Sequence, residues 1–192
     1  MGSLMPIRNY VTGERFTPTN FNTYSINNGL KWLDTKSTSF GANILTSTVF
    51  TTEFDSYRIL IDTWRSSTTN DGLLLRMRTA SGQYSGSTYY YSWNGVIWTS
   101  GSAIGNNGNG LNYVEITAGV NTRQGSATIE LNNVRTSSRP TLHWQAIDAR
   151  NNNNRIGSGF VNNTADYTGF DVFTYSGSTM TCNMSVYGYR KP

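Results

Sequence analysis

The chain of 192 residues contains one histidine and one cysteine, and this scarcity excludes common chemistry. His143 is the only imidazole, and no Gly-x-Ser-x-Gly turn occurs, so the parts of a hydrolytic triad are missing. Dispersed carboxylates with one histidine and one cysteine fall short of the convergent ligands of a transition-metal site. Cys182 has no partner for an internal disulfide, which fits assembly in a reducing compartment. We expect no metal, no other cofactor and no enzymatic turnover.

Charge and long apolar runs are also scarce. Charged residues make up 14% of the chain, and the net charge of +4 comes mostly from scattered arginines. A nucleic-acid-binding face would gather these charges in one patch, so we expect no nucleic-acid partner. No apolar run approaches the roughly 20 residues of a membrane-spanning helix, so we expect no membrane insertion. The Asn-rich stretch 148–155 lacks the alternating acids and central glycine of a calcium loop, and a solvated turn explains it more simply.

The polar side chains that are present belong mainly to Asn, Ser, Thr and Gly, which favour turns and short strands over helices. Apolar and polar residues alternate in many short segments from residue 46 onward. The clearest of these segments are 57–62, 73–78, 113–118, 127–132 and 142–146. A period of two indicates strands that are buried on one face. We therefore predict an all-β fold, an antiparallel and jelly-roll-like β-sandwich, over residues 45–192.

Three turns are predicted between these strands. Asp71-Gly72 has turn chemistry, and we expect a hairpin loop whose ends carry Arg65 and Asp71 as an exposed pair worth ~0–1 kcal/mol. Asn94-Gly95 is the strongest two-residue hairpin signal in the chain. The final strands are predicted to form a hairpin closed by the loop 176–178, with a positive φ at Gly177 or its neighbour.

Two of these hairpins predict which side chains share a face. A turn at Asn94-Gly95 would place an aromatic set on one face of the sheet: Tyr89, Tyr91, Trp93, Val96 and Trp98. In the last strand, the alternating apolar side chains are predicted to face the core: Met180, Cys182, Met184 and Val186.

Residues 1–44 break the alternating pattern, and we interpret them as an N-terminal arm. Prolines and glycines interrupt the segment, and only residues 20–36 are expected to form a short helix, with Asn20 as its N-cap. An arm without its own core must bury its apolar side chains on a partner. The side chains that we expect to act as the anchor are Phe21, Tyr24, Leu30 and Trp32.

A carbohydrate-binding surface is a further hypothesis, because aromatic rings stack on sugars while polar groups bind their hydroxyls. The candidate residues for a glycan-binding or partner-binding surface are Trp64, Arg65, Asp71, Tyr90, Tyr113 and Tyr187. The alternative that these aromatics belong to the core stays open. Five carboxylates could in principle supply the acid pair of a glycosidase: Glu53, Asp62, Asp71, Glu115 and Glu130. Sandwiches of this size carry as many acids on their outer faces.

Three motifs give the sequence a resemblance to a known class of proteins. They are FDSYRILIDTWRSSTTNDGLLLRMRT, then YYYSWNG, and finally TGFDVFTYSGSTMTCNMSVYGY. The pattern of a Phe-x-x-Tyr-x-x-Leu strand, an Asn-Asp-Gly-Leu turn and a closing Val-Tyr-Gly resembles the small β-sandwich proteins of tailed bacteriophages, found in tail fibres or as virion structural proteins. The resemblance covers about residues 45–189, and none of its motifs contains a catalytic residue. The segment from MPIRNY to WLDTK is similar to the short leaders that attach such modules.

The resemblance implies a virion structural protein that is assembled in the bacterial cytoplasm. Its partners would be other copies of itself, in a trimer, and capsid, neck or tail proteins, with the arm docked on the particle and the sandwich facing outward. The sequence has no shaft of heptads, which favours a compact decoration or knob, or a short tail-attached module. Two alternatives are a tail-fibre-type receptor-binding module for host surface carbohydrate and, less favoured, a glycan depolymerase. The sequence does not decide between head and tail.

Overall fold

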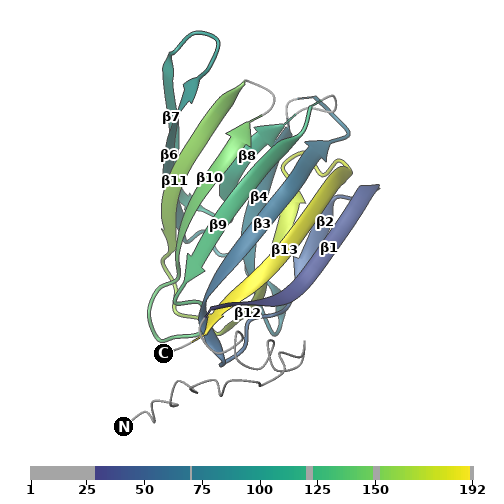
Figure 1. Cartoon of the computed structure of the whole chain (residues 1–192). Helices are drawn as coiled ribbons and strands as arrows, with labels where there is room; N and C mark the ends of the chain where they lie inside the picture. Colours follow the sequence, from purple (N-terminus) through teal and green to yellow (C-terminus); the bar gives the residue numbers. More distant parts are fainter. Residues whose placement is uncertain (1–28, 70, 120–122, 149–151, 191–192) are drawn as a thin grey trace, which may run out of the picture.

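The computed structural model describes residues 29–69, 71–119, 123–148 and 152–190, which form thirteen strands in two antiparallel sheets (Figure 1). The larger sheet has the order β1 (Leu30–Ala42), β13 (Met180–Arg190), β3 (Phe54–Ser66), β9 (Gly125–Asn132), β10 (Thr141–Asp148), β11 (Asn153–Val161), β6 (Tyr89–Ile97) and β7 (Ala103–Leu111). The smaller sheet has the order β2 (Ile44–Ser47), β12 (Tyr167–Thr174), β4 (Asp71–Thr79) and β5 (Gly82–Gln83), and β8 (Val114–Gly119) also pairs with β4. The prediction of an all-β antiparallel fold is confirmed, whereas the jelly roll stays a prediction.

The core lies between the two sheets and is built by the alternation seen in the sequence. Ile59, Ile129 and Met184 line the inner face of the larger sheet, and Leu75 and Val172 face them from the smaller sheet. All predicted inward positions of the last strand are fully buried, namely Met180, Cys182, Met184 and Val186. The hydrophobic effect therefore holds the two sheets together over their common area.

Trp144 links the two sheets near the middle of the core. Its indole Nε1 donates a hydrogen bond of 3.0 Å to the backbone oxygen of Ile116, which lies on β8 of the other sheet. The ring packs on Gly157 of the neighbouring strand β11, where any Cβ would overlap the indole. Glycine is needed here because it leaves room for the largest side chain of the core.

Two of the predicted hairpins are wrong, because the chain changes sheets at both loops. β3 belongs to the larger sheet and β4 to the smaller one, so the connection between them is a crossing and not a hairpin turn. The loop between β12 and β13 crosses back in the same way. Gly177 in that loop has a φ of 75°, as predicted. Strands that cross can both bury their apolar faces in one core, which a local turn pattern does not reveal.

The predicted turn at Asn94-Gly95 is also wrong, because β6 runs straight through it. The turn between β6 and β7 lies at residues 98–102 instead, and this hairpin projects at one corner of the molecule in Figure 1. Gly95 is explained by close approach, since a Cβ there would collide with the backbone oxygen of Asn154 on β11. Tyr89, Tyr91 and Trp93 are buried as an aromatic set, but Val96 and Trp98 are exposed.

The N-terminal boundary also needs correction. Residues 30–42 form β1, the edge strand of the larger sheet, and pair with β13. The helix expected over 20–36 is therefore wrong for residues 30–36, where the ladder with β13 overrides local propensity. Leu30 and Trp32 stand exposed on this strand. Phe21, Tyr24 and the rest of the segment 1–28 lie outside the described residues.

The described residues contain no helix that is long and apolar enough to cross a membrane.

We predict that Cys182→Asp unfolds or strongly destabilises the protein, by about 3–5 kcal/mol, because it buries an unpaired charge. Cys182 is fully buried, and desolvation raises the pKa of its thiol to about 12. Asn183→Asp, at the neighbouring and exposed position, is the matched control and should change stability little. Urea unfolding followed by circular dichroism measures both variants. Similar midpoints for the two variants would show that the core assignment is wrong.

Candidate functional site

The six residues predicted for a binding surface lie in different environments. Trp64 is fully buried, so its assignment to an outward surface is wrong. The reason is a β-bulge in β3, where the pairing register shifts between Ile61 and Trp64 and turns the later side chains inward. Arg65 is half-buried and stacks on the ring of Phe40, with 4.7 Å between its Cζ and the ring centroid.

Asp71 is almost completely buried, so the expectation of an exposed pair with Arg65 is wrong. Its carboxylate accepts five hydrogen bonds. Oδ2 accepts from the hydroxyls of Ser178 at 2.5 Å, Ser66 at 2.6 Å and Ser176 at 2.8 Å. Oδ1 accepts from the backbone N–H groups of Gly72 and Ser176, each at 2.9 Å. One carboxylate thus joins the end of β3, the start of β4 and the loop between β12 and β13.

The protonation of Asp71 is set by two opposing effects. Burial by itself raises the pKa of the carboxyl, because it penalises the charged form. The hydrogen bonds from Ser178, Ser66 and Ser176 act together in the other direction and hold the pKa below its ordinary value of 3.8. Asp71 is therefore a charged structural anchor at neutral pH. Its partners leave little capacity for substrate chemistry.

The other predicted aromatics are on two separate surfaces. Tyr113 forms an edge contact with Tyr175, at 6.1 Å between ring centroids, and both line a small pocket of about 190 Å³ beside Asp71. Tyr90 stacks on Phe160 of β11, with centroids 5.1 Å apart and an angle of 8° between the rings. Tyr187 lies on β13, and four strands separate it from β6, the strand of Tyr90. The structure therefore brings only Tyr113 and Asp71 to a common pocket.

The remaining acids are mostly engaged in ion pairs. Asp171 is fully buried and pairs with Arg78, and Glu115 pairs with Arg155 at 2.6 Å. Glu130 accepts a hydrogen bond of 2.5 Å from Arg58 Nε. Within the described ranges, no group of three or more His, Cys, Asp or Glu side chains is placed to hold a metal ion.

The outer face of the larger sheet carries most of the exposed large hydrophobic side chains of the described residues. Seven large hydrophobic side chains of the described residues are exposed: Leu30, Trp32, Val96, Trp98, Ile147, Ile156 and Tyr175. The pairing registers place Leu30, Trp32, Val96, Ile147 and Ile156 on this face, opposite the buried side chains of the same strands, whereas Trp98 belongs to the turn that follows β6. Apolar side chains that gather on one face, and not singly over the surface, indicate an interaction site.

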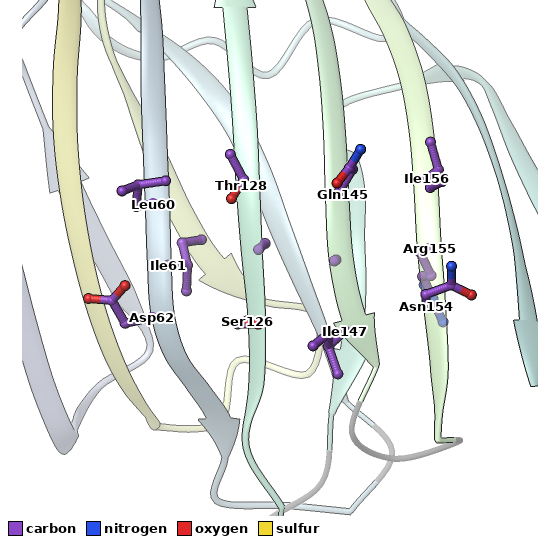
Figure 2. Close-up of a pocket in the computed structure, with 12 residues that line it drawn as sticks. Leu60, Ile61, Asp62, Ser126, Thr128, Gln145, Ile147, Asn154, Arg155 and Ile156 are labelled. Carbon is purple, nitrogen blue, oxygen red and sulfur yellow. The ribbon is translucent and has the colours of Figure 1, made fainter. Parts of the chain in front are cut away.

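One part of this outer face is hollowed into a shallow groove of about 520 Å³ across β3, β9, β10 and β11. Figure 2 shows its side chains in two rows, as the pairing registers require. The first row is Leu60, Thr128, Gln145 and Ile156, and the second is Asp62, Ser126, Ile147 and Asn154. Three steps between neighbouring strands make the groove roughly 14 Å wide. Its volume lies in the range of small-ligand sites.

None of these groove residues except Asp62, as a possible acid, was proposed for a site from the sequence. Gln145 could be assigned to a polar face from its alternation with Trp144 and Ala146. That it lies between Thr128 and Ile156 follows only from the strand order. The sequence signal that could have indicated the groove was therefore the set of polar residues that alternate with core residues in each strand.

We predict that Asp71→Ala destabilises the protein by about 2–4 kcal/mol, because the buried Ser66 hydroxyl and four part-buried donors lose their acceptor at once. Asp62→Ala removes an exposed carboxylate from β3 and serves as the control, with a change below about 0.5 kcal/mol. Chemical unfolding monitored by tryptophan fluorescence gives both values. Equal stability of the two variants would contradict the role of Asp71 as an anchor.

We also predict a pH dependence that belongs to Asp71. Its folded-state pKa lies below the unfolded value, so the unfolded state binds the proton more readily and stability rises with pH in this window. The stabilisation is complete above about pH 4–5 and is lost as the pH falls through the folded-state pKa. In Asp71→Asn the dependence of unfolding free energy on pH should be shallower below pH ~4 than in the wild type. Parallel curves for both proteins would refute this assignment.

Comparison of the chain with models of protein families, with curated proteins and with solved structures gave no match. What the outer face binds is therefore inferred from its own side chains.

Proposed function

We propose that the protein is a structural and binding component of a bacteriophage virion that performs no enzymatic reaction. In this proposal it is a compact decoration, knob or short tail-attached module, held by the residues that precede β1. It presents the outer face of its larger sheet to the surroundings. The observation that supports a binding role is the exposure of Val96, Ile147 and Ile156 at and beside the groove on that face, apart from Leu30 and Trp32 of the edge strand β1, which we assign to the anchor. The phage origin rests on the three sequence motifs that resemble virion proteins.

The contacts of the acids support a role without turnover. General acid–base catalysis needs two titratable groups that reach one substrate bond. Asp71 is buried in a cage of hydroxyl and amide donors, and Glu115 and Glu130 are each held by an arginine. These contacts fix strands and loops to one another. We therefore place the biological effect of the protein in binding and not in cleavage.

Attachment through the N-terminal segment fits the position of β1. This strand begins at Leu30 on one edge of the larger sheet, next to β13. Trp32 is 60% exposed near the start of β1, where a neighbouring protein could cover it. We propose that Phe21 and Tyr24 act with Leu30 and Trp32 as the anchor, and that copies of the chain associate as a trimer.

A second candidate function is a receptor-binding module of the tail, and the groove on the outer face favours it. A host polysaccharide that such a module bound would keep its length during incubation. Shortening of the polysaccharide by the wild type, but not by variants of single acids, would instead support a depolymerase and contradict the proposal. Location in the purified particle separates a head decoration from a tail module.

We predict that deletion of residues 2–28 leaves a folded sandwich that no longer joins the particle. The deletion removes no described strand, because β1 starts at Leu30. Deletion of residues 2–44 is the informative comparison, because it also removes β1 and exposes the edge of β13. We expect this longer deletion to lower the unfolding temperature. Mass spectrometry of purified virions from a complemented phage measures incorporation. Normal incorporation of the shorter deletion would show that the anchor lies elsewhere.

A further inference from the structure

The floor of the groove on the outer face offers hydrogen-bonding groups without a cationic centre. Gln145 is exposed at its middle and makes no side-chain hydrogen bond to another described residue. Asn154 uses Oδ1 to accept from the backbone N–H of Val96 at 3.0 Å, which fixes the amide and leaves its NH₂ group for a ligand. Thr128 adds a hydroxyl on the strand beside Gln145. Amides and hydroxyls both donate and accept, as the hydroxyl groups of a sugar do.

Charge is nearly absent from this floor. Asp62 is the one charged side chain among the outward residues that line the groove. Arg155 belongs to the lining only through its strand, because its guanidinium lies on the inner side, 4.0 Å from the Trp93 ring centroid and 2.6 Å from Glu115. Phosphate or nucleic acid would need cations here, and none faces outward. The floor therefore suits an uncharged ligand.

The groove and its surroundings also supply apolar contact. Ile147 and Ile156 are 43% and 50% exposed on neighbouring strands. Val96 follows on β6 opposite Asn154, and Trp98, in the turn after β6, donates its backbone N–H to the backbone oxygen of Asn152 at 2.8 Å. Trp98 is 56% exposed and lies outside the groove lining, so its ring is open to a ligand that extends beyond the groove. Apolar side chains beside polar groups suit a ligand that has apolar ring faces and polar edges.

We propose that this groove binds a neutral oligosaccharide. Gln145, Asn154 and Thr128 hydrogen-bond the sugar hydroxyls, while Ile156, Ile147 and the Trp98 ring contact the ring faces. A second copy of the chain fits less well, because the buried centre of a protein interface is more apolar than this floor and is enriched in aromatic residues and arginine, which the outward lining of the groove lacks. The inference rests on the proposed binding role of the outer face and specifies its ligand.

The test uses the full-length protein on an array of neutral and anionic bacterial surface oligosaccharides, followed by titration calorimetry with the best neutral ligand. Gln145→Ala and Trp98→Ala remove a polar and an apolar contact from different strands. We expect each to weaken binding about five- to tenfold. Asn107→Ala is the matched control, because it removes an exposed amide from the same face of β7, outside the groove, and should leave affinity unchanged.

Several outcomes would overturn the proposal. They are the absence of binding to every neutral glycan, preference for anionic glycans, or equal affinity of Gln145→Ala, Trp98→Ala and the wild type. A homo-oligomer that dissociates in Ile156→Ser would identify the groove as a contact between copies and would also overturn it. Measuring the incorporation of Gln145→Ala into virions distinguishes a failure of the glycan proposal from a failure of the proposed virion role. If that variant enters particles normally but no glycan binds, the ligand assignment fails while the virion role stands.

Discussion

The carboxylate of Asp71 is the constraint on which the arrangement of the two sheets depends. The chain passes from the larger to the smaller sheet between β3 and β4, and returns between β12 and β13. Both crossings meet at this one side chain, which accepts hydrogen bonds from Ser66 at the first crossing and from Ser176 and Ser178 at the second. Hydrogen bonds to a charged acceptor contribute about 1.5–3 kcal/mol each, and the three serine hydroxyls also bond to one another around the carboxylate. The hydrogen bonds of Asp71 thus hold four strand ends together: the ends of β3 and β12 and the starts of β4 and β13.

The inner and outer faces of the larger sheet have different roles. Its inner face carries the core, including the Trp144 contact that joins it to β8 of the smaller sheet. Its outer face has no sheet packed on it, yet it carries most of the exposed large apolar side chains of the described residues. A row of contacts that includes Arg58, Glu130 and Tyr189 stiffens this face beside the groove. A rigid sheet presents binding groups with little loss of entropy.

The sequence predicted the strands and their buried faces well, because the alternation of apolar and polar residues shows directly which side chains are buried. Ile59, Ile129 and Met184 are examples in which period two was sufficient. It failed at Trp64, where a bulge reverses the alternation, and at Asn94-Gly95, where a turn-like dipeptide serves close strand packing instead. Such effects depend on neighbours that are distant in the chain.

The candidate site was beyond sequence reasoning for a related reason. Its residues come from four strands, β3, β9, β10 and β11, and only the spatial order of those strands makes them neighbours. The aromatic residues that attracted attention in the sequence are divided between the core and two distant surfaces, because large rings are buried wherever the sandwich has room for them. The polar residues that alternate with core positions were the more useful indication of the groove.

The central claim is that the outer face of the larger sheet is the exposed binding surface of a virion component. A cryo-electron microscopy reconstruction of the phage particle that the proposal implies tests it most directly. The account predicts a small sandwich on the particle surface, attached near β1, with the groove across β3, β9, β10 and β11 open to solvent or filled by a ligand. A sandwich whose larger sheet is packed against the particle, with the smaller sheet facing outward, would contradict the account, as would the absence of the protein from the particle.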